Sequence, residues 1–94
     1  MATYRNSRID AVIDVRSHVE YFFGHLPGSV CMPLGGLEHA LAERLDLTPD
    51  SNILLVCASG ARSAVAAKAL RRMGYRRVID GGAYSAARPD YDQR

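Results

Sequence analysis

Residues 53–70, ILLVCASGARSAVAAKAL, join four apolar residues to a cysteine, a short loop of small residues and an alanine-rich segment. A continuous apolar run of this length is typical of a strand that is covered on both faces. The alanine-rich segment predicts a helix over residues 63–73, with Gly74 as its C-cap. Cys57 therefore lies where a buried strand turns into a helix.

The rest of the chain repeats this alternation of strands and helices over short distances, which predicts a single small α/β domain over residues 1–94. Its central sheet should be mainly parallel and flanked by helices. The predicted elements are a strand over 11–15, a helix over 18–23, a strand over 30–32, a helix over 37–45 with Leu37, Leu41 and Leu45 as its buried stripe, a strand over 76–80, a turn at Gly81 and Gly82, and a helical turn over 83–87.

Composition narrows the class of protein. The net charge of +2 is spread along the chain without a basic tract, so we expect no nucleic-acid partner. The N-terminus MATYRNSRID lacks the apolar core of a secretory signal, and no stretch approaches the ~20 apolar residues that span a membrane. Two cysteines are too few for a disulfide framework. We expect a cytoplasmic protein without membrane association.

The loop after Cys57 has the composition of an anion-binding site. Small residues allow the backbone N–H groups at the start of a helix to converge, and Gly60 can adopt a positive φ angle. Ser63 is placed to cap the helix, and Arg62 adds positive charge. This setting should lower the pKa of the Cys57 thiol and favour a nucleophilic thiolate. The alternative is that Cys57 is only a small buried hydrophobe.

Four segments of the chain resemble single-domain rhodaneses, over roughly residues 10–85. These segments are VIDVRSHVEYFFGHLPGSVCMPL, ILLVCASGARSAVAAKAL, MGYRRV and DGG. The first contains an aspartate-valine-arginine strand end, an acidic residue at Glu20 and the GHxPG pattern at residues 24–28. The resemblance implies a rhodanese-like fold.

The resemblance also implies a sulfurtransferase. Cys57 would take a sulfane sulfur from a small anion such as thiosulfate, hold it as a persulfide, and pass it to cyanide or a thiol, with no metal or organic cofactor. The residues implied to cradle the sulfur are Ala58, Ser59, Gly60, Ala61, Arg62 and Ser63. Converging N–H donors suit an anionic persulfide, because they stabilise its negative charge.

Two other functions use the same loop chemistry. A sulfur-carrier or regulatory binding module would act on protein donors or acceptors of sulfur. A cysteine-based phosphatase or arsenate reductase is disfavoured by loop length, because related phosphatases have five residues between cysteine and arginine, whereas four separate Cys57 from Arg62 here.

Three further residues are expected to support the site. Asp14 and Arg16, on alternating positions of a strand end, should form an ion pair that holds neighbouring loops. His25, which lies in the GHLPG turn, should be hydrogen-bonded to backbone groups. Cys31 is expected to pack as a small apolar residue, or to act as a resolving thiol if its Cα lies within about 7 Å of that of Cys57.

Two features differ from the family pattern. Ala58 stands where many thiosulfate-using members have a basic residue, which leaves the sulfur donor open. Only about ten residues precede the first predicted strand, so the N-terminal edge of the sheet is expected to be abbreviated. An exposed sheet edge or apolar patch there could be covered by a second copy of the chain in a homodimer.

Overall fold

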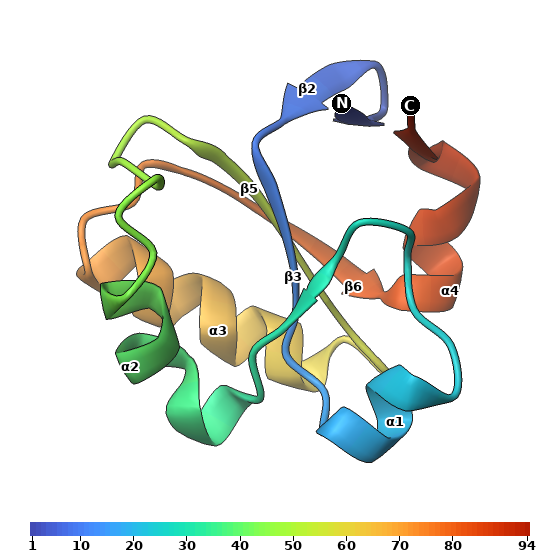
Figure 1. The fold of residues 1–94 in the computed structure, drawn as a ribbon, viewed down its shortest axis with the longest axis horizontal. Helices are drawn as coiled ribbons and strands as arrows, with labels where there is room; N and C mark the ends of the chain where they lie inside the picture. Colours follow the sequence, from blue (N-terminus) through green and yellow to red (C-terminus); the bar gives the residue numbers. More distant parts are fainter.

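The computed structural model describes residues 1–94, which form a four-stranded parallel sheet and a three-stranded antiparallel sheet (Figure 1). The strand orders are β4-β3-β5-β6 and β2-β1-β7. In chain order the elements are β1 (Ala2–Tyr4), β2 (Ser7–Ile9), β3 (Ala11–Asp14), α1 (His18–Phe22), β4 (Val30–Cys31), the 3-10 helix η1 (Leu34–Gly36), α2 (Leu37–Ala42), β5 (Asn52–Cys57), α3 (Ala61–Arg72), β6 (Arg77–Ala83), α4 (Tyr84–Ala87), the 3-10 helix η2 (Arg88–Asp90) and β7 (Tyr91–Gln93).

β5 is the central strand, and every residue from Ile53 to Cys57 is buried. Alternate residues of β5 point into two separate apolar clusters, one formed with α2 and α3 and the other with β1, β2 and α4. Leu55 and Cys57 belong to the first cluster, and Leu54 and Val56 to the second. The predicted strand covered on both faces is therefore confirmed, and Figure 1 shows α2 and α3 together on one side of the sheet.

Two helix predictions were wrong at their ends. α3 begins at Ala61 rather than at residue 63, because Gly60 with φ +99° makes the turn from the strand directly into the helix. α2 ends at Ala42, so Leu45 does not join the buried stripe of Leu37 and Leu41 and is instead 91% exposed.

The predicted turn at Gly81 and Gly82 was also wrong, because both glycines lie inside β6, next to a bulge in its pairing with β5. A Cβ atom on Gly81 would lie 2.9 Å from Leu54 Cδ1 and 3.1 Å from the carbonyl oxygen of Leu55. Glycine is needed there because the two strands approach each other closely.

The N-terminal residues, expected to be an abbreviated edge, form the short hairpin β1–β2. Its turn is made by Arg5 and Asn6, both with positive φ angles. β1 also pairs with β7, so that Ala2 lies opposite Gln93 and the two chain ends meet (Figure 1).

Exposed apolar side chains gather on α1 rather than at the N-terminal edge. Phe22 and Phe23 are 80% and 82% exposed, with their rings edge to face at 5.4 Å, and Val19 is also exposed. No helix has the length and apolar character that crossing a membrane requires.

Candidate active site

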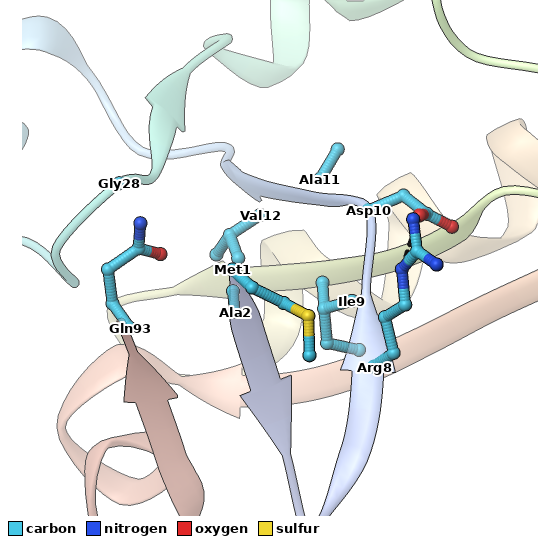
Figure 2. A pocket seen from close by; sticks show the side chains of 9 residues that line it. All are labelled: Met1, Ala2, Arg8, Ile9, Asp10, Ala11, Val12, Gly28 and Gln93. Carbon is cyan, nitrogen blue, oxygen red and sulfur yellow. Dashed lines mark ion pairs between the residues drawn. The ribbon is translucent and has the colours of Figure 1, made fainter.

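The candidate site lies at the carboxyl end of the parallel sheet and not in the pocket shown in Figure 2. That pocket, of about 370 Å³, lies between the short strands and the first residues of β3, which are at the opposite end of the sheet. Its charged side chains, Arg8 and Asp10, form an ion pair at 3.4 Å. It holds no cysteine and no histidine, so the nucleophile predicted from the sequence lies elsewhere.

Cys57 is the last residue of β5, and its thiol is buried beneath the turn into α3. The backbone N–H of Gly60 donates a hydrogen bond to Cys57 Sγ at 2.8 Å. The positive φ angle of Gly60 gives the loop this curvature. Ala58, Ser59 and Ala61 are exposed and form the outer surface of the loop above the sulfur.

Ser63 is not the helix cap that was predicted, because Gly60 occupies the N-cap position of α3. The Ser63 side chain is instead buried beside the Cys57 sulfur. The Cys57 thiol donates to Ser63 Oγ at 3.4 Å, and the Ser63 hydroxyl donates to the carbonyl oxygen of Gly60 at 3.1 Å. When Cys57 ionises, rotation of this hydroxyl turns its proton toward the sulfur, since a thiolate accepts and no longer donates.

The pKa of the Cys57 thiol is lowered by its surroundings. Burial raises the pKa, but the hydrogen bonds from the Ser63 hydroxyl and from the backbone N–H groups of Ser63, Gly60 and Ser59 together outweigh this effect. The predicted direction is confirmed. The cause includes the converging backbone N–H groups that the sequence predicted, and the Ser63 hydroxyl, for which the sequence predicted a different role, adds to them.

Arg62 is held by Glu20 of α1. The guanidinium donates to both carboxylate oxygens, with NH1–Oε1 and NH2–Oε2 distances of 2.7 and 2.9 Å. This pairing, followed by the backbone hydrogen bond from Ser17, lowers the pKa of Glu20 to about 2. Glu20 also forms a capping box with Ser17, a pattern that was visible in the sequence as SHVE.

Asp14 and Arg16 form the predicted ion pair, which is almost fully buried. Arg16 Nε and NH2 bind both carboxylate oxygens at 2.9–3.1 Å, and NH2 also donates to the carbonyl oxygen of Gly24 at 2.6 Å. The guanidinium lies 4.0 Å from the ring centroid of Tyr84, a contact that sequence reasoning missed. The pair ties the end of β3 to the loop that follows α1.

His25 is bonded to the backbone as predicted. Its Nδ1 lies 2.8 Å from the carbonyl oxygen of Tyr21, and its ring stacks on the Tyr21 ring with centroids 3.6 Å apart. The Tyr21 hydroxyl donates to the carbonyl oxygen of Ser29. These contacts stiffen the GHLPG segment that runs from α1 to β4.

Cys31 is a poor resolving thiol for Cys57. β3 lies between β4 and β5, with Asp14 opposite both Cys31 and Val56, so two strand spacings of about 4.8 Å separate the cysteines. The register places Cys31 on the Val56 face of the sheet, whereas Cys57 points to the other face. A disulfide requires Cα atoms within about 7 Å, so the resolving-thiol prediction is wrong for this fold.

The comparisons with known proteins agree with this geometry. The model of the rhodanese-like domain family matches residues 2–86, and the chain therefore belongs to that family.

Two curated relatives carry names related to sulfur transfer. The chain is 38% identical over 69 residues to a putative sulfur carrier protein, YrkF, of Bacillus subtilis, covering 73% of this chain and 36% of the relative. It is 34% identical over 73 residues to the adenylyltransferase and sulfurtransferase uba4 of Ogataea parapolymorpha, covering 78% and 18%. The chain thus matches about a third of the first relative's length and less than a fifth of the second's.

Solved structures confirm the fold. A rhodanese-like domain protein from Staphylococcus aureus superposes with a TM-score of 0.72 at 23% identity, covering 87% of this chain and 76% of that one. The human single-domain sulfurtransferase TSTD1 superposes with a TM-score of 0.68 at 25% identity, covering 83% and 77%. The predicted fold class is therefore correct.

Proposed function

We propose that this domain is a sulfurtransferase that carries a sulfane sulfur on Cys57 as a persulfide. The observation that carries the proposal is the set of hydrogen bonds on the sulfur, led by the Gly60 N–H at 2.8 Å, which lowers the pKa of the thiol. A thiolate is the form that attacks a sulfane sulfur. The names of the two curated relatives support the same chemistry.

The reaction has two balanced steps. The Cys57 thiolate attacks the outer sulfur of the donor, a new S–S bond forms at Cys57, and the electron pair of the broken bond leaves with the rest of the donor, which is sulfite when the donor is thiosulfate. The acceptor, cyanide or a thiol, then takes the outer sulfur, and the thiolate returns. Backbone N–H groups around the loop stabilise the anion in both states, so neither a metal nor an organic cofactor is required for the balance.

A sulfur-carrier or regulatory module acting on protein partners is the second candidate. The relative named as a putative sulfur carrier favours it, and the loop chemistry is the same. The two functions differ in the acceptor, since a carrier keeps its sulfur in the presence of small acceptors and releases it to a protein. Self-association remains a separate prediction, for which Phe22 and Phe23 are the exposed apolar surface.

Intact-mass spectrometry tests the proposal. After prolonged incubation with thiosulfate, the wild-type chain and Cys31→Ser should gain the mass of one sulfur atom, and Cys57→Ser should not. The adduct should disappear on addition of cyanide, with formation of thiocyanate. Sulfur retained by Cys57→Ser would refute the role of Cys57. Hydrolysis of phosphate esters without a sulfur adduct would support the phosphatase alternative instead.

A further inference from the structure

The cation nearest to the reactive loop is already neutralised by a carboxylate. Arg62 and Glu20 form two parallel hydrogen bonds, a geometry that is stronger and better oriented than a single contact. Each side chain is 35% exposed, so the pair lies at the surface beside the loop. The pKa of the Arg62 guanidinium is raised, first by the hydrogen bond with Glu20 and to a smaller extent by the charge of Cys57.

The loop around the sulfur carries no charged side chain, and the arginine that follows the adjacent strand is also paired. Residues 58–61 are Ala-Ser-Gly-Ala, so the loop itself is uncharged. Arg16, at the end of the adjacent strand β3, has its charge matched by Asp14, and the side chains of both residues are at most 5% exposed. The sulfur is therefore stabilised by hydrogen bonds from neutral groups, and the two arginines of this region are both paired.

We infer that Glu20 sets the class of sulfur donor, so that the site takes sulfur from the persulfide of a thiol in preference to thiosulfate. This inference rests on the proposed function. A thiosulfate dianion must approach a thiolate, and the two repel each other unless a nearby cation offsets the repulsion. With Arg62 bound by Glu20, the pair contributes no net charge. A persulfide that approaches as neutral R–S–SH meets no such repulsion.

The transfer from a persulfide balances without a further reactant. The Cys57 thiolate attacks the terminal sulfur of R–S–SH, the S–S bond of the donor breaks, and R–S⁻ leaves with the electron pair. The products are Cys57–S–SH and the donor thiolate, with the same total charge as the reactants. No net oxidation or reduction occurs, because one S–S bond replaces another.

Replacing Glu20 by glutamine tests the inference with little change of shape. The Oε1 atom of Glu20 accepts a hydrogen bond from the backbone N–H of Ser17, and a glutamine keeps an acceptor oxygen there. The substitution therefore preserves the start of α1. It removes the negative charge that opposes Arg62, together with the second hydrogen bond from Arg62, which the amide NH2 group cannot accept. Glu38→Gln is the matched control, because Glu38 is an exposed carboxylate on α2.

The rate of sulfur loading should be measured in the Cys31→Ser background, with thiosulfate and with the persulfide of 2-mercaptoethanol as separate donors. We expect the persulfide to load Cys57 faster in the parent protein. Glu20→Gln should raise the thiosulfate rate about tenfold and the persulfide rate by less than about threefold, and Glu38→Gln should change neither. Added salt should accelerate thiosulfate loading of the parent protein and accelerate that of Glu20→Gln less, because salt screens the repulsion.

Two results would overturn the inference while leaving the proposed function intact: faster loading by thiosulfate than by the persulfide in the parent protein, or an equal effect of Glu20→Gln on both donors. Absence of a sulfur adduct with either donor would overturn the proposed function, and the inference with it. Circular dichroism of each variant establishes that the fold is intact. If Glu20→Gln is unfolded, Arg62→Gln replaces it: the Glu20 carboxylate is then unpaired, so thiosulfate loading should slow more than persulfide loading, and an equal effect on both donors would contradict the inference.

Discussion

Replacing Ser63 by alanine should raise the pKa of the Cys57 thiol by about one unit. The substitution removes a buried hydroxyl that lies 3.4 Å from the sulfur and leaves the backbone N–H groups in place. A hydrogen bond to a charged group contributes about 1.5–3 kcal/mol, and one pKa unit corresponds to about 1.4 kcal/mol. The long donor–acceptor distance favours the lower end of that range.

The stability of the fold should fall by only about 1 kcal/mol. The carbonyl oxygen of Gly60 loses the hydrogen bond from the Ser63 hydroxyl, but it still accepts one from the backbone N–H of Ala64 at 3.2 Å. No buried acceptor is therefore left without a partner, which is the situation that makes such substitutions costly. A change in thiol reactivity can thus be separated from unfolding.

The assay is the pH dependence of alkylation of Cys57 by iodoacetamide, measured in Cys31→Ser protein. The midpoint should move upward by about one pH unit in Ser63→Ala, so that alkylation below the midpoint is about tenfold slower. Ser59→Ala is the control, since Ser59 is exposed and acts through its backbone N–H. An unchanged midpoint in Ser63→Ala, or an equal shift in Ser59→Ala, would show that the hydroxyl does not stabilise the thiolate.

Glu20 should make the fold sensitive to acid: its pKa is about 2 in the folded chain against 4.5 ordinarily, so its stabilising contribution is fully present above pH 4.5 and is lost as the pH falls toward 2. The free energy of unfolding in urea should therefore fall less steeply with decreasing pH in Glu20→Gln than in the parent chain. An equal slope in the two proteins would contradict this. Arg16→Met should destabilise the chain by about 3 kcal/mol, because Asp14 is left buried without its partner, and Asp14→Asn in the same chain should recover part of the loss. Gly60→Ala should lower the free energy of unfolding by about 1–2 kcal/mol through strain at φ +99° alone, since its Cβ meets nothing closer than 3.9 Å, and Gly35→Ala, which has no positive φ, should have a smaller effect.

The central sheet was predictable because its signals are local. The apolar run ending at Cys57 and the alanine-rich segment after it each contain enough residues to specify an element without help from the rest of the chain. The strands β1, β2 and β7 have three residues each, and their pairing joins positions up to about ninety residues apart. Such short segments carry no periodicity that a sequence window can detect.

The residues of the candidate site also fall into those that local sequence signals revealed and those whose contacts these signals did not reveal. Cys57 and Gly60 were found from the sequence because a nucleophile and a positive φ angle are properties of the loop itself. α1 supplies Glu20, the partner of Arg62, and α4 supplies Tyr84, whose ring lies against the Arg16 guanidinium. These contacts depend on how the elements pack, so the sequence revealed the residues without revealing their pairing. Ser63 was placed near the site but given the wrong role, because a shift of two residues in the helix start turns a cap into a core residue.

The pairing of β1 with β7 has a consequence for how the chain folds. β1 cannot complete its sheet until the last residues of this sequence are available, since Ala2 pairs with Gln93 and the backbone N–H of Arg94 bonds to the carbonyl oxygen of Met1 at 2.8 Å. Contacts between such distant positions close late, because the loop entropy must be overcome first. During synthesis on the ribosome, the parallel sheet can therefore assemble around β5 while the apolar face that β1 and β2 later cover is still open, and this interval is when the domain is most prone to aggregate.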